Sequence, residues 1–128
     1  MRTFMLGDAE HTIDANALCP FIYSEEFTRA GKNGKKVPED IMVCVGRVGE
    51  AATSEDGMPP LFDMQKLWWT FEKAANPKTP AFRVWLRNLP HEAINIGDEG
   101  GWAQQVMDEM MDGFFPGHAR KVVEAPSA

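Results

Sequence analysis

The side chains of this sequence that could carry out chemistry are few and widely spaced. There are three histidines and two cysteines, at His11, His91, His118, Cys19 and Cys44. Zinc ligands and cysteine–histidine active sites usually show short, recognisable spacings or local motifs. No pair here has a metal-binding spacing, so the sequence predicts no metal site and no cofactor. A cysteine–histidine pair that the fold brings together stays open at this point.

Two glycine-containing segments resemble ligand loops without matching them. The run from Gly31 to Lys36, GKNGKK, has the lysines of a phosphate loop, but Lys36 stands where such a loop needs a serine or threonine for magnesium. The run from Asp98 to Gly101, DEGG, is too short for a calcium loop. A Gly-x-Ser-x-Gly nucleophile motif is absent from the sequence. We therefore predict no catalytic residues and no enzyme activity.

The composition is that of a small acidic globular protein. The chain has 128 residues, 44% of them hydrophobic, which is typical of one domain. Nineteen acidic and thirteen basic residues give a net charge of −6. Binding of nucleic acid needs a basic field, so nucleic acid is not expected as a partner. No apolar run approaches the roughly 20 residues that span a membrane, and we expect no membrane partner.

The same features suggest a compartment and a domain plan. Acidic and polar residues lie within the first ten positions, which a signal peptide would not have. Two cysteines without a disulfide framework are expected to be reduced and buried in a cytoplasmic protein. We expect one globular domain over residues 1–117 and a flexible tail over residues 118–128.

The sequence from Leu61 to Leu89 predicts two consecutive amphipathic helices that form the centre of the fold. The first should end near Asn76, because Pro77 disfavours helical angles in its predecessor. The second should begin with Thr79 as N-cap and Pro80 in the first turn. Its buried face should consist of Phe82, Trp85, Leu86 and Leu89.

Adjacent tryptophans complicate the first of these helices. Trp68 and Trp69 point about 100° apart on a helix, and Phe62 lies on the same stripe as Trp69. One interpretation places the helix between two layers of the domain. The other places Phe62 and Trp69 on a surface for self-association or for a partner, because aromatic residues are enriched at interface centres.

The remaining segments complete a prediction of an α+β fold, mainly α, with an N-terminal β-hairpin packed on four to five helices. Residues 3–14 alternate apolar and polar residues around Gly7-Asp8, as a hairpin does. A helix should begin near Pro20, with Phe21 and Ile22 facing inward. Residues 38–52 favour a helix, although residues 41–45 would also suit a strand, and Gly46 and Gly49 in that helix would permit close packing against a neighbour.

A last helix, beginning between residues 99 and 102, carries three of the eight methionines. Trp102, Val106 and Met110 share its buried stripe, and Met107 and Met111 lie beside it. Methionine fills irregular cores and is also used on adaptable binding surfaces. Core packing and partner binding are therefore both open for Met107 and Met111.

The order of these features resembles the tail assembly chaperones of long-tailed phages and prophages, especially those of Gram-positive hosts. The resemblance rests on three segments. Pro20 to Phe27 fits a Pro-x-x-Tyr-x-x-x-Phe pattern, Leu67 to Ala75 is similar to the middle helix of the family, and Phe82 to Leu86 fits Phe-x-x-Trp-Leu. The chain departs from the family at Thr28-Arg29-Ala30, where a Phe-Gly-x-Asp step is common.

The resemblance implies a non-enzymatic assembly factor in the cytoplasm of a bacterial host. Such a protein binds the tape measure protein, keeps it soluble and helps to recruit tail tube protein around it. A second copy of the chain is a further candidate partner. Phe62, Trp69, Met107 and Met111 are the residues where we expect the partner surface. The alternative is a structural tail component or another phage or bacterial adaptor that binds proteins.

Overall fold

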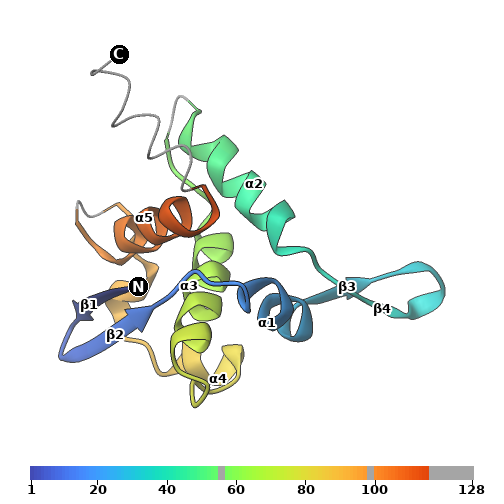
Figure 1. The fold of residues 1–128 in the computed structure, drawn as a ribbon, viewed down its shortest axis with the longest axis horizontal. Helices are drawn as coiled ribbons and strands as arrows, with labels where there is room; N and C mark the ends of the chain where they lie inside the picture. The colour runs from blue at the N-terminus through green and yellow to red at the C-terminus, as the bar shows by residue number, and fades with distance from the viewer. Residues whose placement is uncertain (55–56, 98–99, 116–128) are drawn as a thin grey trace.

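The computed structural model describes residues 1–54, 57–97 and 100–115, which fold into two β-hairpins and five α-helices (Figure 1). The predicted fold class is confirmed: an N-terminal hairpin packs on helices in a mainly α structure. The predicted tail, residues 118–128, lies outside the described residues. In chain order the elements are β1 (Arg2–Leu6), β2 (Ala9–Ile13), α1 (Cys19–Glu26), β3 (Thr28–Ala30), a 3₁₀ turn (Lys32–Gly34), β4 (Lys36–Pro38), α2 (Ile41–Ala52), α3 (Leu61–Ala75), α4 (Phe82–Arg87), a second 3₁₀ turn (His91–Ile94) and α5 (Trp102–Phe114).

The N-terminal hairpin forms where its alternating pattern predicts it. β1 and β2 pair antiparallel, with Phe4 opposite His11 and Leu6 opposite Ala9. Gly7 has φ +61°, a left-handed turn conformation that glycine adopts without steric cost. Phe4, Leu6, His11 and Ile13 are buried on the inner face, where the hairpin contacts α3 and α5. These helices supply the packing that an isolated hairpin lacks.

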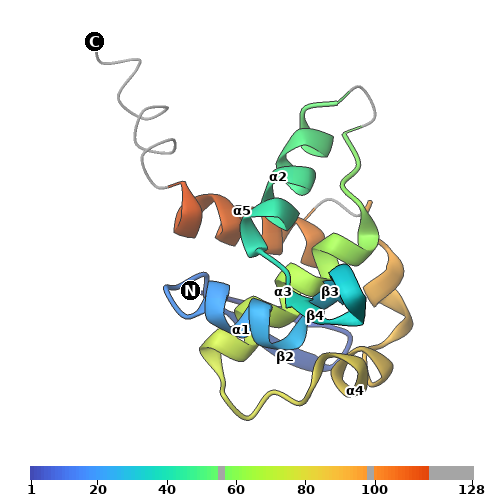
Figure 2. The same cartoon turned by 90° about the vertical axis from the view of Figure 1, so that its right-hand side faces the viewer.

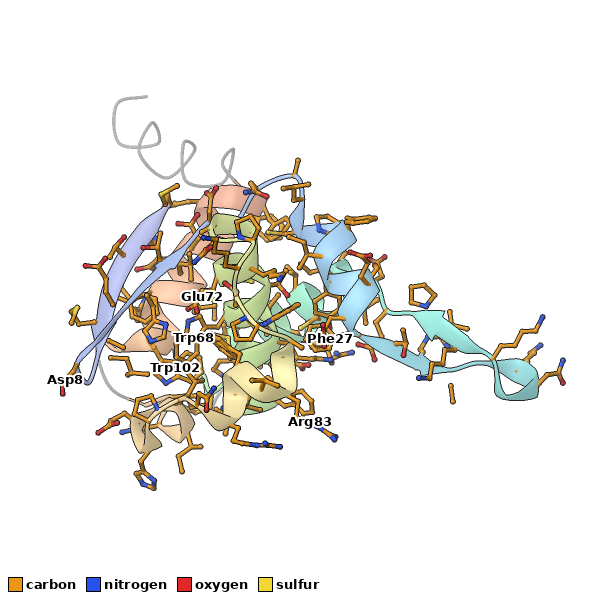
Figure 3. All side chains as sticks on the ribbon, turned by 90° about the horizontal axis from the view of Figure 1, so that it is seen from below. Asp8, Phe27, Trp68, Glu72, Arg83 and Trp102 are labelled. Carbon is orange, nitrogen blue, oxygen red and sulfur yellow. The ribbon has the colours of Figure 1, made fainter. Side chains whose placement is uncertain are left out.

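Helix α3 lies at the centre of the molecule and has no solvent-facing side through its middle. Every residue from Asp63 to Phe71 is buried. On one side Trp68 stacks on Trp102, with ring centroids 4.7 Å apart, and both residues are labelled in Figure 3. On another side the ring centroid of Trp69 lies 5.6 Å from that of Phe27 and 6.1 Å from that of Phe82. The structure thus shows α3 packed between two layers of the domain.

Of the two helices before α3, α2 agrees with the sequence expectation and α1 differs from it in one respect. Residues 41–45 are helical, and α2 begins after Asp40, whose side chain accepts a hydrogen bond from the Met42 backbone N–H at 2.9 Å. The inward orientation predicted for Phe21 in α1 is wrong, because Phe21 is exposed and Tyr23 is buried instead. The Tyr23 hydroxyl donates to a Glu39 carboxylate oxygen at 3.3 Å, so burial of the ring leaves its polar group paired.

Helix α4 is shorter than its sequence pattern predicts. It begins at Phe82, and Ala81 stands at its N-cap, so the prediction that Thr79 caps it is wrong. The Thr79 hydroxyl instead donates to the Asn76 carbonyl at 2.8 Å and closes the turn after α3. The predicted buried face is correct at Phe82 and Trp85, while Leu86 and Leu89 are half-buried.

Strands β3 and β4 form an arm that projects from the helices (Figures 1 and 3). The arm contains the GKNGKK segment, whose backbone makes a tight turn with Asn33 at φ +64° and Gly34 at φ +73°. A β-carbon on Gly31 would lie 2.4 Å from the Val37 side chain, so this position requires glycine. Lys32, Lys35 and Lys36 are exposed, which places them on a solvated turn.

One carboxylate connects the hairpin, α3 and α4. Glu72 Oε1 lies 2.7 Å from His11 Nδ1 and accepts from the Trp68 indole N–H at 3.2 Å. Glu72 Oε2 accepts from the Trp85 indole N–H at 2.7 Å. Indole N–H groups can only donate, and a buried donor without an acceptor costs free energy. Glu72 therefore allows these aromatic rings to be buried together.

Replacing Glu72 should destabilise the whole fold. We expect Glu72→Ala to lower the free energy of unfolding by about 2–4 kcal/mol, because it leaves two indole N–H groups without an acceptor. Glu72→Gln, which keeps one acceptor oxygen, should lower the free energy of unfolding by a smaller amount. Urea denaturation followed by far-UV circular dichroism measures both.

The matched control is Glu50→Ala on α2, whose side chain has no hydrogen-bond partner among the described residues. This substitution should change the free energy of unfolding by no more than about 0.5 kcal/mol. Equal losses for Glu72→Ala and Glu50→Ala would contradict the central role of the Glu72 carboxylate.

Candidate binding groove

Helices α2 and α5 both pack on α3 (Figure 2). Residues of α2 and α5 line an apolar groove. The groove has a volume of about 600 Å³. It is lined mostly by methionine, glycine and other small or apolar residues: Met42, Val45, Gly46, Gly49, Glu50, Ala52, Thr53, Met107, Met110, Met111 and Phe115. An open apolar groove of this kind is a candidate site for a binding partner.

Part of the α2 wall of the groove is formed by one methionine and two glycines. Met42, Gly46 and Gly49 are spaced four and three residues apart, so they share a helix face. Met42 is 46% exposed. A β-carbon on Gly46 or Gly49 would have no atom within 4 Å. The expectation that these glycines permit close packing against a neighbour is therefore not met within the described residues.

These glycines also weaken the helix that contains them. Glycine inside a helix costs about 1 kcal/mol relative to alanine. Neither Gly46 nor Gly49 has a positive φ, so alanine would fit the backbone at both positions. Nothing in the described residues requires glycine there, and the effect of the two glycines is to widen the groove.

The α5 wall is held in place by ionic contacts at the opposite side of that helix. Buried Glu109 lies 3.2 Å from the N-terminal ammonium group and 3.2 Å from Arg2 Nε. It also accepts from the Ala15 backbone N–H at 2.9 Å. Gly113 allows close contact with Ala15, since a β-carbon there would lie 2.4 Å from the Ala15 side chain. With this side of α5 fixed, Met107 and Met111 line the groove.

Among the described residues that line the groove, Glu50 on the α2 wall is the one that carries a charge. Within the described residues the Glu50 carboxylate has no ion pair. The neighbouring guanidinium of Arg47 is already bonded to both carboxylate oxygens of Asp63 at 2.9 and 3.0 Å. Burial alone would raise the pKa of Asp63, but these two bonds keep that pKa below its usual value. The groove therefore has an acidic character.

The four residues predicted for a partner surface do not lie together. Met107 and Met111 line the groove. Phe62 is 59% exposed but stacks on Phe82 with ring centroids 6.0 Å apart, beside a separate small pocket. Trp69 is only 2% exposed and donates its indole N–H to the Pro80 carbonyl at 2.8 Å. The placement of Trp69 on a partner surface is thus corrected, because its ring lies in the core.

Sequence reasoning did not identify the α2 wall as part of a site. The signal was present in Met42, Gly46 and Gly49, which form a stripe beside the buried face of α2. An exposed stripe of this composition is ambiguous in sequence, because small residues also occur where two helices of one domain pack tightly. Only the structure shows that the space next to these glycines is open.

Of the remaining candidates for chemistry, both cysteines are buried, His11 is buried and His91 is exposed. Cys19 and Cys44 are free and buried, and burial raises the pKa of each thiol to about 11. Within residues 1–54, 57–97 and 100–115, no three histidine, cysteine or acidic residues are placed to hold a metal ion. The groove is therefore the feature of the described residues on which we base a function.

Comparisons with protein-family models, curated proteins and solved structures found no match to this chain. In the described part of the chain, no helix combines the length and the apolar character needed to cross a membrane.

Burial of the thiols predicts that they are unreactive in the folded protein. With a pKa near 11, only about one thiol in a thousand is ionised at pH 8, and the thiolate is the reactive form. We expect negligible reaction with Ellman's reagent at pH 8 in the native state and two reactive thiols after unfolding in guanidinium chloride.

A variant with an added surface cysteine, Glu25→Cys on α1, is the matched control, because residue 25 is exposed. It should show one fast-reacting thiol in the native state. Fast native reaction of Cys19 or Cys44 in the unmodified protein would show that the site around that thiol is open to solvent.

Proposed function

We propose that this chain is a non-enzymatic tail assembly chaperone of a long-tailed phage or prophage. In this role it binds the tape measure protein in the cytoplasm of the bacterial host, keeps that protein soluble and promotes assembly of tail tube protein around it. The resemblance of three sequence segments to this family suggests the role. The observation that carries the proposal is the open methionine-lined groove between α2 and α5.

The chemistry of the groove suits a protein that holds long helical chains. Methionine side chains are flexible and polarisable, and surfaces rich in methionine repack around different apolar sequences. Met42, Met107 and Met111 line the groove together with Met110. An amphipathic helix that inserts its apolar face into such a groove uses a common mode of peptide recognition. A chaperone needs this tolerance, because it must contact many turns of one long partner.

The charge of the chain supports the same role. A net charge of −6 increases the solubility of a complex in which apolar segments are held. The described lining of the groove offers few convergent polar groups, and Glu50 is the charged residue among them. This favours binding of an apolar protein segment over recognition of a small polar substrate.

The test is co-expression with the tape measure protein of the same phage, followed by affinity capture of this chain. We expect a soluble complex under conditions where the tape measure protein alone is insoluble. Met42→Glu should reduce the recovered complex at least about tenfold, because a charge on the groove wall would be buried by the partner. Met5→Glu is the matched control, since Met5 is 60% exposed on the hairpin and lies outside the groove.

Three results would contradict the proposal. The first is that the tape measure protein stays insoluble when this chain is present. The second is that Met42→Glu and Met5→Glu give the same amount of recovered complex. The third is that this chain is a stoichiometric part of finished tails. The last result would identify a structural tail component, because a chaperone leaves before the tail is complete. Trp69→Ala is not a useful test of binding, because it removes a ring from the core.

A further inference from the structure

We propose that the groove between α2 and α5 selects a basic amphipathic helix. Its large apolar side chains would lie over Gly46 and Gly49, and its lysine or arginine side chains would lie beside Glu50. This inference rests on the proposed function and specifies the chemistry of the segment that is bound. It assigns one occupant to the groove, a helix of a partner protein.

The dimensions of the groove fit a helix of moderate length. Helix α2 has 12 residues, which corresponds to about 18 Å at 1.5 Å per residue. A partner helix of three to four turns would span this wall. The two walls of the groove belong to separate helices that both pack on α3 (Figure 2). A rod-shaped occupant matches this form.

The glycines determine where the partner's large side chains are placed. No atom lies within 4 Å of a β-carbon built on Gly46 or Gly49, so the space beside them is available to an incoming group. Absent β-carbons let a neighbouring helix approach closely. Met42 on one side and Met107 and Met111 on the other can then close around the inserted side chains, because methionine adopts many conformations.

The charge of the groove determines the sign of the partner's polar face. Glu50 lines the groove and has no ion pair within the described residues. A lysine or arginine one turn from the partner's apolar stripe would meet this carboxylate, and the net charge of −6 would favour the approach of a basic segment. An acidic helix or an anionic lipid would meet repulsion at the same place.

The experiment compares two synthetic 18-residue helical peptides with the same leucine stripe. One has lysine on its polar face and the other has glutamate. Each carries a fluorophore, and binding to the full chain is measured by anisotropy at low salt. We expect the lysine peptide to bind at least tenfold more tightly than the glutamate peptide. Glu50→Lys should reverse this preference, whereas Glu25→Lys, which makes the same charge change on α1 outside the groove, should not.

A second variant separates binding from folding. Gly46→Ala combined with Gly49→Ala should raise the midpoint of thermal unfolding, because alanine favours the helix and meets no clash. The same variant should weaken binding of the lysine peptide at least tenfold, because two methyl groups narrow the groove. Val43→Ala is the control, since Val43 is exposed on α2 and does not line the groove. A stabilised variant that binds less cannot be explained by misfolding.

Equal affinity for the two peptides, or unchanged binding after both alanine substitutions, would overturn the inference. So would a dimer of the unmodified chain that the alanine variant abolishes without any peptide binding, because that result would assign the groove to a second copy. If the chain captures the tape measure protein but neither peptide binds, the inference fails while the proposed function stands. If the lysine peptide binds as described but the tape measure protein is not captured, the proposed function fails and the groove specificity stands.

Discussion

The fold depends on pairing the polar atoms of a core made largely of aromatic rings. Three indole groups pack together around α3. The ring centroid of Trp68 lies 4.9 Å from that of Trp85 and 4.7 Å from that of Trp102. Indole rings release much apolar surface from water, but each carries an N–H that must find an acceptor when buried. Glu72 supplies acceptors for Trp68 and Trp85, and the Glu92 carbonyl accepts from Trp102 at 3.2 Å. Because Glu72 also contacts His11, the same carboxylate fixes the hairpin against the helices.

A second polar contact lets α3 be buried on its remaining side. The Lys66 ammonium group pairs with Glu39 at 3.1 Å and lies 5.1–5.4 Å from the ring centroids of Tyr23, Phe27 and Phe62. The attraction between a cation and aromatic ring faces, together with the ion pair, offsets the loss of hydration. Lys66 of α3 thus contacts Tyr23 of α1 and Phe27 just after that helix, and its partner Glu39 lies just before α2. Exposed Phe62 thus has a structural role as well as a surface position.

Sequence reasoning identified the elements of the fold but not the relation between them. The hairpin, α3, α5 and their apolar stripes follow from local patterns, because alternation and helical spacing are set by backbone geometry. The position of Trp69 did not follow, because an aromatic stripe looks the same in sequence whether it faces solvent or a second layer of the domain. The helix start at Thr79 failed for a related reason. Its hydroxyl is needed to close the turn after α3, and a local capping rule does not include that competing use. Met107 and Met111 were proposed from composition and line the groove, but recognition of the facing wall required the relative placement of α2 and α5.

The groove can exist because stability is concentrated elsewhere in the molecule. The aromatic core around α3 and the contacts of Glu109 with Arg2, Ala15 and the N-terminus hold α5. Helix α2 is anchored by its buried face and by the bonds between Arg47 and Asp63. Each of the two helices packs against α3, and residues of both line the space between them. The groove walls therefore contain two helix-weakening glycines and three partly exposed methionines that the packing of the described core does not require.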